Sequence, residues 1–87
     1  MKYNVYWEEN ATQEVAAESL AGNDKVAIID ATHQIDRALE SDPIGNGMPL
    51  NEGMFYIDRP PLRVIYSIYS IDAEANRVDV GRIRRIP

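Results

Sequence analysis

The most regular hydrophobic pattern in the chain lies in its last third, where apolar and polar side chains alternate over residues 62–71. β-branched and aromatic residues dominate this stretch, which favours a strand over a helix. Successive side chains of a strand point to opposite faces. The apolar face carries Leu62, Val64, Tyr66 and Ile68, and the mixed face carries Arg63, Ile65, Ser67 and Tyr69. We expect a central strand with one face in the core and a semi-polar face opposite.

Two further strands are predicted before this one. Residues 2–7 alternate, and Tyr3, Val5 and Trp7 share the apolar face. This pattern indicates a first, half-buried strand. Residues 54–58 predict a short strand that turns through an arginine and two prolines into the central strand.

A last strand is predicted from residue 76 or 77 to Arg84. Val78 and Val80 share one face, but the next apolar residue, Ile83, breaks the period of two. Gly81 lies between them, at a position that suits a β-bulge.

A first helix is predicted over residues 11–21, which are rich in alanine and glutamate. Asn10 and Gln13 have the spacing of a capping box, and Gly22 suits the left-handed residue that follows many helices. The apolar stripe is thin and consists of Val15, Ala16 and Leu20.

A second helix is predicted to begin after Asn23 or Asp24 and to run to about Glu40. Its apolar stripe has helical spacing and consists of Ile28, Ala31, Thr32, Ile35, Ala38 and Leu39. Pro43 ends it, because the residue before a proline avoids helical geometry. Residues 44–53 contain three glycines and a proline and are predicted to form a loop.

The predicted order is β-α-α-β-β-β. Consecutive strands favour an antiparallel sheet of about four strands, and the short connection between the helices makes them a hairpin on one sheet face. We therefore expect an α+β fold in a single domain over residues 1–87.

Composition narrows the function. The chain has no cysteine, a net charge of −5, and no apolar run of the roughly 20 residues that a membrane helix needs. We expect a cytoplasmic protein that binds no membrane and binds nucleic acid weakly or not at all. The charge is uneven: residues 1–58 carry three basic and eleven acidic side chains, a net −8, whereas residues 59–87 carry six arginines and three acids, a net +3.

Motifs for metal or cofactor chemistry are not expected. His33 is the only histidine and has no second ligand four residues on, so it is interpreted as a surface residue. The sequence contains no phosphate-binding glycine loop and no nucleophile elbow. We predict no metal and no cofactor.

The order of motifs resembles the RelE/ParE superfamily, the toxins of type II toxin–antitoxin modules, which include plasmid stabilisation proteins. The resemblance covers almost the whole chain: the strand ending in Trp7, the helix with residues 33–39, Asp42-Pro43, residues 61–66 and residues 78–80. It implies a toxin that binds a cellular target, gyrase or the ribosome, and is neutralised by a cognate antitoxin protein.

The ribonuclease branch of this family cleaves messenger RNA on the ribosome, with the 2′-hydroxyl as nucleophile and basic side chains that stabilise developing charge. The resemblance implies Arg63, together with Arg82 or Arg84, as the catalytic residues of such an enzyme. Residues 54–58 carry no lysine, and no tyrosine or histidine follows the last strand. The expectation is therefore a protein-binding toxin, and the alternatives are a ribonuclease or an inactive family member kept as an interaction module. The residues predicted to bind a partner are Arg63, Tyr69, Arg82, Arg84 and Arg85.

Overall fold

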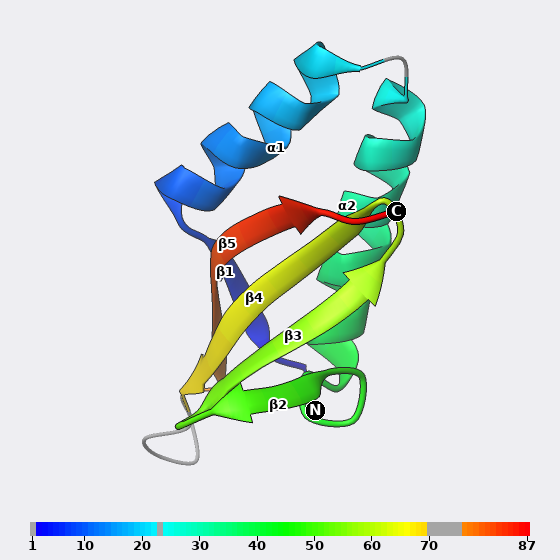
Figure 1. The fold of residues 1–87 in the computed structure, drawn as a ribbon. Helices are drawn as coiled ribbons and strands as arrows, with labels where there is room; N and C mark the ends of the chain where they lie inside the picture. Colours follow the sequence, from blue (N-terminus) through cyan, green and yellow to red (C-terminus); the bar gives the residue numbers. More distant parts are fainter. Residues whose placement is uncertain (1, 23, 70–75) are drawn as a thin grey trace.

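The computed structural model describes residues 2–22, 24–69 and 76–87. The chain folds into two helices and a five-stranded sheet, and both helices lie between the first and second strands in the sequence (Figure 1). The elements are β1 (Asn4–Trp7), α1 (Glu9–Ala21), α2 (Lys25–Ser41), β2 (Met48–Asn51), β3 (Met54–Arg59), β4 (Leu62–Tyr69) and β5 (Arg77–Arg85). The strand order in the sheet is β1-β5-β4-β3-β2. The predicted α+β class is confirmed.

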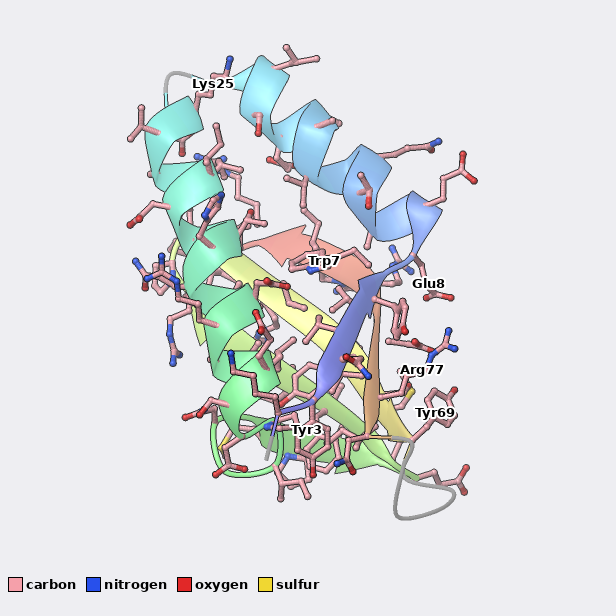
Figure 2. The ribbon with its side chains drawn as sticks, turned by 180° about the vertical axis from the view of Figure 1, so that it is seen from behind. Tyr3, Trp7, Glu8, Lys25, Tyr69 and Arg77 are labelled. Atoms are coloured by element: carbon pink, nitrogen blue, oxygen red, sulfur yellow. The ribbon has the colours of Figure 1, made fainter. Side chains whose placement is uncertain are left out.

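Both helices lie on one side of the sheet and leave the other side open (Figures 1 and 2). We call the open side the outer face. Trp7 donates from Nε1 to Asp36 Oδ1 at 2.9 Å and so joins β1 to α2. In the part of the chain that the structure describes, no helix is long and apolar enough to cross a membrane.

The sheet differs from the prediction in two respects. It has a fifth strand, β2, inside the segment predicted to be a loop. β2 is an exposed edge strand that contains Pro49, so it shows none of the alternation by which a half-buried strand is found in a sequence. In addition, β1 pairs with β5 in parallel, whereas the other pairs are antiparallel. Sequence order alone does not reveal this pairing of first and last strands.

The core lies between α2 and the sheet. Its buried residues are Ala11, Ile28, Ala31, Ile35, Leu39, Ile57, Leu62, Val64, Tyr66, Val78, Val80 and Ile83. The predicted stripe of α2 is therefore confirmed, since four of its members are buried and the other two are half-buried. α2 ends at Ser41 before Pro43, as predicted.

The predictions for α1 were partly wrong. Leu20 is 84% exposed and Ala16 is exposed, whereas Ala11 is the buried residue. The capping box is absent, because the helix begins at Glu9 and Asn10 already lies within it. Gly22 is extended, with φ −135° and ψ 179°, and not left-handed. α1 packs against β5 and α2, and the apolar stripe that usually marks a helix lying on a sheet is weak here.

The residue before α2 is Asp24, which makes no side-chain capping hydrogen bond, while Asn23 lies outside the described residues. The last two residues of the predicted central strand, 70 and 71, also lie outside them.

The predicted bulge in β5 is confirmed. Tyr66 pairs with Val80 and Ile65 pairs with Arg82, so Gly81 is the extra residue. The bulge brings Ile83 to the same face as Val78 and Val80, and all three are buried.

Candidate functional site

The outer face collects side chains from four strands. On β4 it carries the predicted mixed set, and the registers place β5 and β3 residues beside them. Arg63 pairs with Arg84 of β5 and with Asp58 of β3, and Ile65 pairs with Arg82. Arg63, Arg82 and Arg84 are therefore brought together on one open face, as their shared assignment to a site requires.

A groove of about 650 Å³ crosses this face. Its floor is formed by β4 and β5, and one wall is formed by the start of α1. The lining residues include Glu8, Glu9, Asn10, Met54, Ile65, Ser67, Tyr69, Asp79, Arg82 and Arg84. The groove mixes acidic, basic and apolar side chains, and it is not a uniformly positive cleft.

Arg63 is held by two neighbours on β3. Its Nε and Nη2 donate to the Asp58 carboxylate at 2.7 and 2.9 Å, a two-point contact that fixes the guanidinium. The guanidinium carbon lies 4.4 Å from the centre of the Tyr56 ring. The hydrogen bonds from Arg63 hold the pKa of Asp58 below its ordinary value. The Arg63 guanidinium is therefore fixed in place, and the Asp58 carboxylate balances its positive charge.

The same arrangement recurs at the opposite end of the face. Arg77 Nε donates to Asp79 Oδ1 at 2.7 Å, and its guanidinium carbon lies 4.4 Å from the centre of the Tyr6 ring. Tyr69 of β4 pairs with Arg77, and Figure 2 shows both at the end of the sheet. Tyr6 and Tyr69 are 49% and 45% exposed. Two arginine–carboxylate–tyrosine groups therefore flank the groove.

Arg82 and Arg84 are less constrained. Arg82 Nη2 is 4.0 Å from Glu14 Oε2, a loose ion pair. Arg84 is exposed and makes no ion pair within the residues that the structure describes. Arg84 is therefore the most available positive charge of the predicted set.

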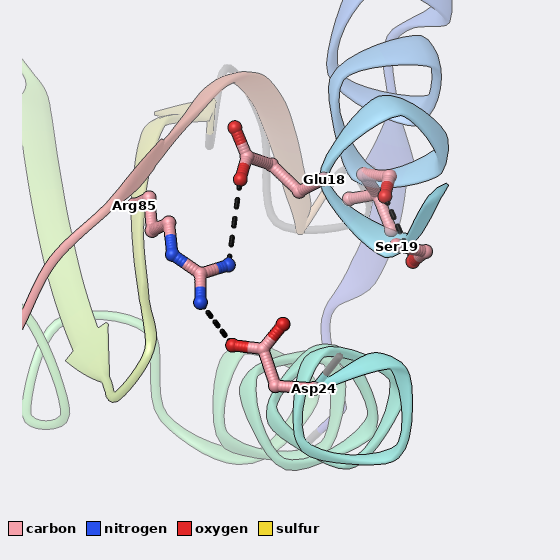
Figure 3. Close-up of polar contacts among 5 residues, drawn as sticks. Glu18, Ser19, Asp24 and Arg85 are labelled. Atoms are coloured by element: carbon pink, nitrogen blue, oxygen red, sulfur yellow. Dashed lines mark hydrogen bonds and ion pairs between the residues drawn. The ribbon is translucent and has the colours of Figure 1, made fainter. Parts of the chain in front are cut away.

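Arg85 does not belong to this group. It points to the helix side, where it pairs with Glu18 at 3.5 Å and with Asp24 (Figure 3). The hydrogen bond from Arg85 lowers the pKa of Asp24. The bulge explains this, because Arg85 follows the buried Ile83 by two residues and shares its face.

Sequence reasoning missed part of this surface. Tyr56, Arg77 and Tyr6 contribute to it as much as the residues that were named, and none of the three was predicted to belong to a binding site. The signal that was available is the alternation of Tyr56 and Asp58 around the buried Ile57, which places both on one face. Within the described residues, no group of three or more His, Asp or Glu side chains is arranged to hold a metal ion, and His33 is exposed.

Comparison with known proteins gives a likeness in structure. No known family's sequence model matches the chain, and no curated protein matches it. Solved structures resemble it along its whole length, and the class that they define is the α+β fold of the RelE/ParE-type toxins.

Three of them illustrate the likeness. One chain of the toxin–antitoxin complex RelBE2 from Mycobacterium tuberculosis has a TM-score of 0.75 and 20% identity, over 98% of this chain and 99% of that one. A chain of the chromosomal ParDE system from P. aeruginosa has a TM-score of 0.72 and 19% identity, over 99% of this chain and 98% of that one. A chain of the intact E. coli RelBE toxin–antitoxin complex has a TM-score of 0.65 and 18% identity, over 98% of both chains. The chain has the RelE/ParE-type fold that was expected.

Proposed function

We propose that this protein, as a single domain over residues 1–87, is the toxin component of a type II toxin–antitoxin module. It acts by contact with a cellular target, gyrase or the ribosome, and an antitoxin protein neutralises it in the cytoplasm. Support comes from the full-length likeness in fold to chains solved as parts of RelBE and ParDE complexes.

One observation supports contact with a protein over cleavage of RNA. The guanidinium of Arg63, the residue that best matches the family's catalytic arginine, already holds the Asp58 carboxylate at 2.7 Å. A phosphate that approached Arg63 would meet that negative charge. An antitoxin segment with backbone and apolar groups meets exposed tyrosine, methionine and arginine, which are the residue types enriched at protein interfaces.

The binding residues proposed for the outer face are Arg63, Tyr69, Arg82 and Arg84, extended by Tyr56. Arg85 is left out of this set, because it is engaged with the helices. No cofactor takes part in the proposed activity.

A ribonuclease is the second candidate, and one feature favours it. Arg84 lies directly across from Arg63 and is free to stabilise a developing negative charge, with Arg82 beside it. A third candidate is an inactive family member retained for protein interaction.

Two assays separate these candidates. Induced expression of a toxin arrests bacterial growth, and co-expression of the adjoining reading frame's product restores it. Primer extension on a defined message in a translation extract then tests for cleavage. We expect growth arrest without cleavage. Site-specific cuts that Arg84→Ala abolishes would establish the ribonuclease. Unimpaired growth at high expression would favour the third candidate, an inactive family member.

A further inference from the structure

Beyond Gly81, β5 has a neighbouring strand on one side only. β1 pairs with β5 from Arg77 to Val80, whereas β5 continues along β4 to Arg85. A strand edge without a partner presents backbone groups that pair readily with another extended chain. In this protein α1 packs against β5 and lies along that side of the sheet (Figure 1).

The backbone directions identify the edge. Ile83 N–H points away from β4 and donates to Glu14 Oε1 of α1 at 3.3 Å. Ile86 N–H points the other way and donates to the Pro61 carbonyl at 2.8 Å. Because these directions alternate along a strand, the Arg85 N–H points to the same side as that of Ile83.

Carboxylates of α1 occupy this edge. Glu14 accepts from Ile83 N–H and lies near Arg82, and Glu18 lies one turn further and pairs with Arg85 (Figure 3). The two glutamates are four residues apart and therefore lie on one side of the helix. They stand where the carbonyls and side chains of an added strand would lie.

Apolar contacts hold α1 only weakly. Ala11 is its one fully buried residue, Val15 is half-buried, and Leu20 is 84% exposed. An isolated helix of this length is marginal in water. Residues 9–21 carry three glutamates and no basic residue, and Glu18 lies near the C-terminal end, where the helix dipole disfavours a negative charge. The polar contacts of α1 with β5 include the hydrogen bond from Ile83 N–H to Glu14 and the ion pairs of Glu14 with Arg82 and of Glu18 with Arg85, and salt weakens such ion pairs.

We propose that α1 is a dissociable cover on the C-terminal half of β5, and that an extended acidic segment of a partner pairs with this strand edge when α1 lifts. The partner's carbonyls accept from the Ile83 and Arg85 N–H groups, and its acidic side chains replace Glu14 and Glu18. The identification of the partner as the antitoxin rests on the proposed function, whereas the proposal that α1 dissociates from β5 does not.

Hydrogen exchange of the whole chain, followed by NMR, tests the cover. The test variant Glu14→Gln/Glu18→Gln keeps the side-chain acceptors and removes two charges from the edge. The matched control Glu9→Gln/Asp30→Asn removes two charges whose side chains accept hydrogen bonds only from Gln13 and Gln34 among the contacts described.

In the test variant, and in the wild type at roughly 1 M sodium chloride, where the Debye length falls to about 3 Å, α1 amides and Ile83 N–H should exchange several-fold faster. The amides of α2 should keep their rates. Equal acceleration of amide exchange in both variants would overturn the proposal that α1 is a dissociable cover. Exchange of the α1 amides at the same rates as those of α2 would also overturn it.

A peptide that alternates glutamate and threonine tests the strand edge, with a lysine–threonine peptide as control. The acidic peptide should shift the Ile83 and Arg85 amide resonances and bind the Glu14→Gln/Glu18→Gln variant several-fold more tightly, because more molecules are open. Shifts confined to other residues, or weaker binding to the variant, would reject the site. Growth arrest is scored separately, so an inactive toxin with a functional edge is distinguished from an active toxin without one.

Discussion

Tyr66 offers the sharpest test of how the fold is held together. Its ring is 1% exposed, it stacks on Phe55 with ring centres 5.8 Å apart, and its hydroxyl donates to the Pro43 carbonyl at 2.6 Å. This hydrogen bond fastens the segment after α2 to the central strand. Tyr66→Phe keeps the ring contacts and removes only the hydroxyl.

The variant leaves the carbonyl of the buried Pro43 without its donor, at a cost of about 1–2 kcal/mol. For a domain of this size we expect the midpoint of thermal unfolding to fall by about 5–10 °C. Circular dichroism melts and urea titrations of both proteins measure this. A melting temperature equal to that of the wild type would show that water reaches the hydroxyl, and it would refute this account of the core.

The same hydroxyl makes stability depend on alkaline pH. Burial raises the pKa of Tyr66 from 10.0 to about 12. Because the folded protein disfavours the ionised form, the contribution to stability is complete below the unfolded pKa and is lost as pH rises through the folded pKa. Urea midpoints of the wild type should fall across this window, and those of Tyr66→Phe should fall less. Parallel pH profiles would contradict the burial of an ionisable hydroxyl.

Three further changes probe other parts of the structure. Leu39→Ala should lower the free energy of unfolding by about 2–5 kcal/mol because Leu39 is fully buried, and an unchanged melting curve would show that Leu39 does not lie on the buried face of α2. Gly47→Ala should cost about 1–3 kcal/mol, because an added Cβ would lie 1.7 Å from the Tyr66 hydroxyl; a smaller cost in the Tyr66→Phe background is the diagnostic result in a double-mutant cycle. Arg63→Met should reduce the loss of stability in acid, since Asp58 contributes above its ordinary pKa of 3.8 and loses that contribution as pH falls below it; identical urea midpoints of the two proteins at every acidic pH would contradict the pairing.

The elements found from the sequence are those whose pattern reports burial directly. β4 alternates because one face packs on α2, and α2 shows a stripe because it lies across the sheet. Gly81 was identified because it interrupts an otherwise regular apolar alternation in β5. In each case a single segment contains the evidence for its own environment.

The features that were missed depend on neighbours that a single segment does not specify. β2 is exposed on both faces, so its strand conformation comes from pairing with β3. The stripe of α1 was misassigned because the helix meets a strand edge through Glu14 and Glu18, which polar patterning assigns to solvent. Arg85 was grouped with Arg84 by proximity in sequence, although alternation places them on opposite faces.

Binding of the antitoxin to the outer face is the central claim, and calorimetric titration tests it most directly. The titrant is the acidic or amphipathic tail of the protein encoded by the adjoining reading frame. Arg84→Glu reverses an available charge on the outer face, and Lys25→Glu makes the same charge change at the start of α2, at the far end of the helical hairpin (Figure 2). The account predicts that Arg84→Glu weakens binding by at least about tenfold and that Lys25→Glu changes it little. Wild-type affinity in Arg84→Glu together with a loss in Lys25→Glu would contradict it and would place the antitoxin on the helices.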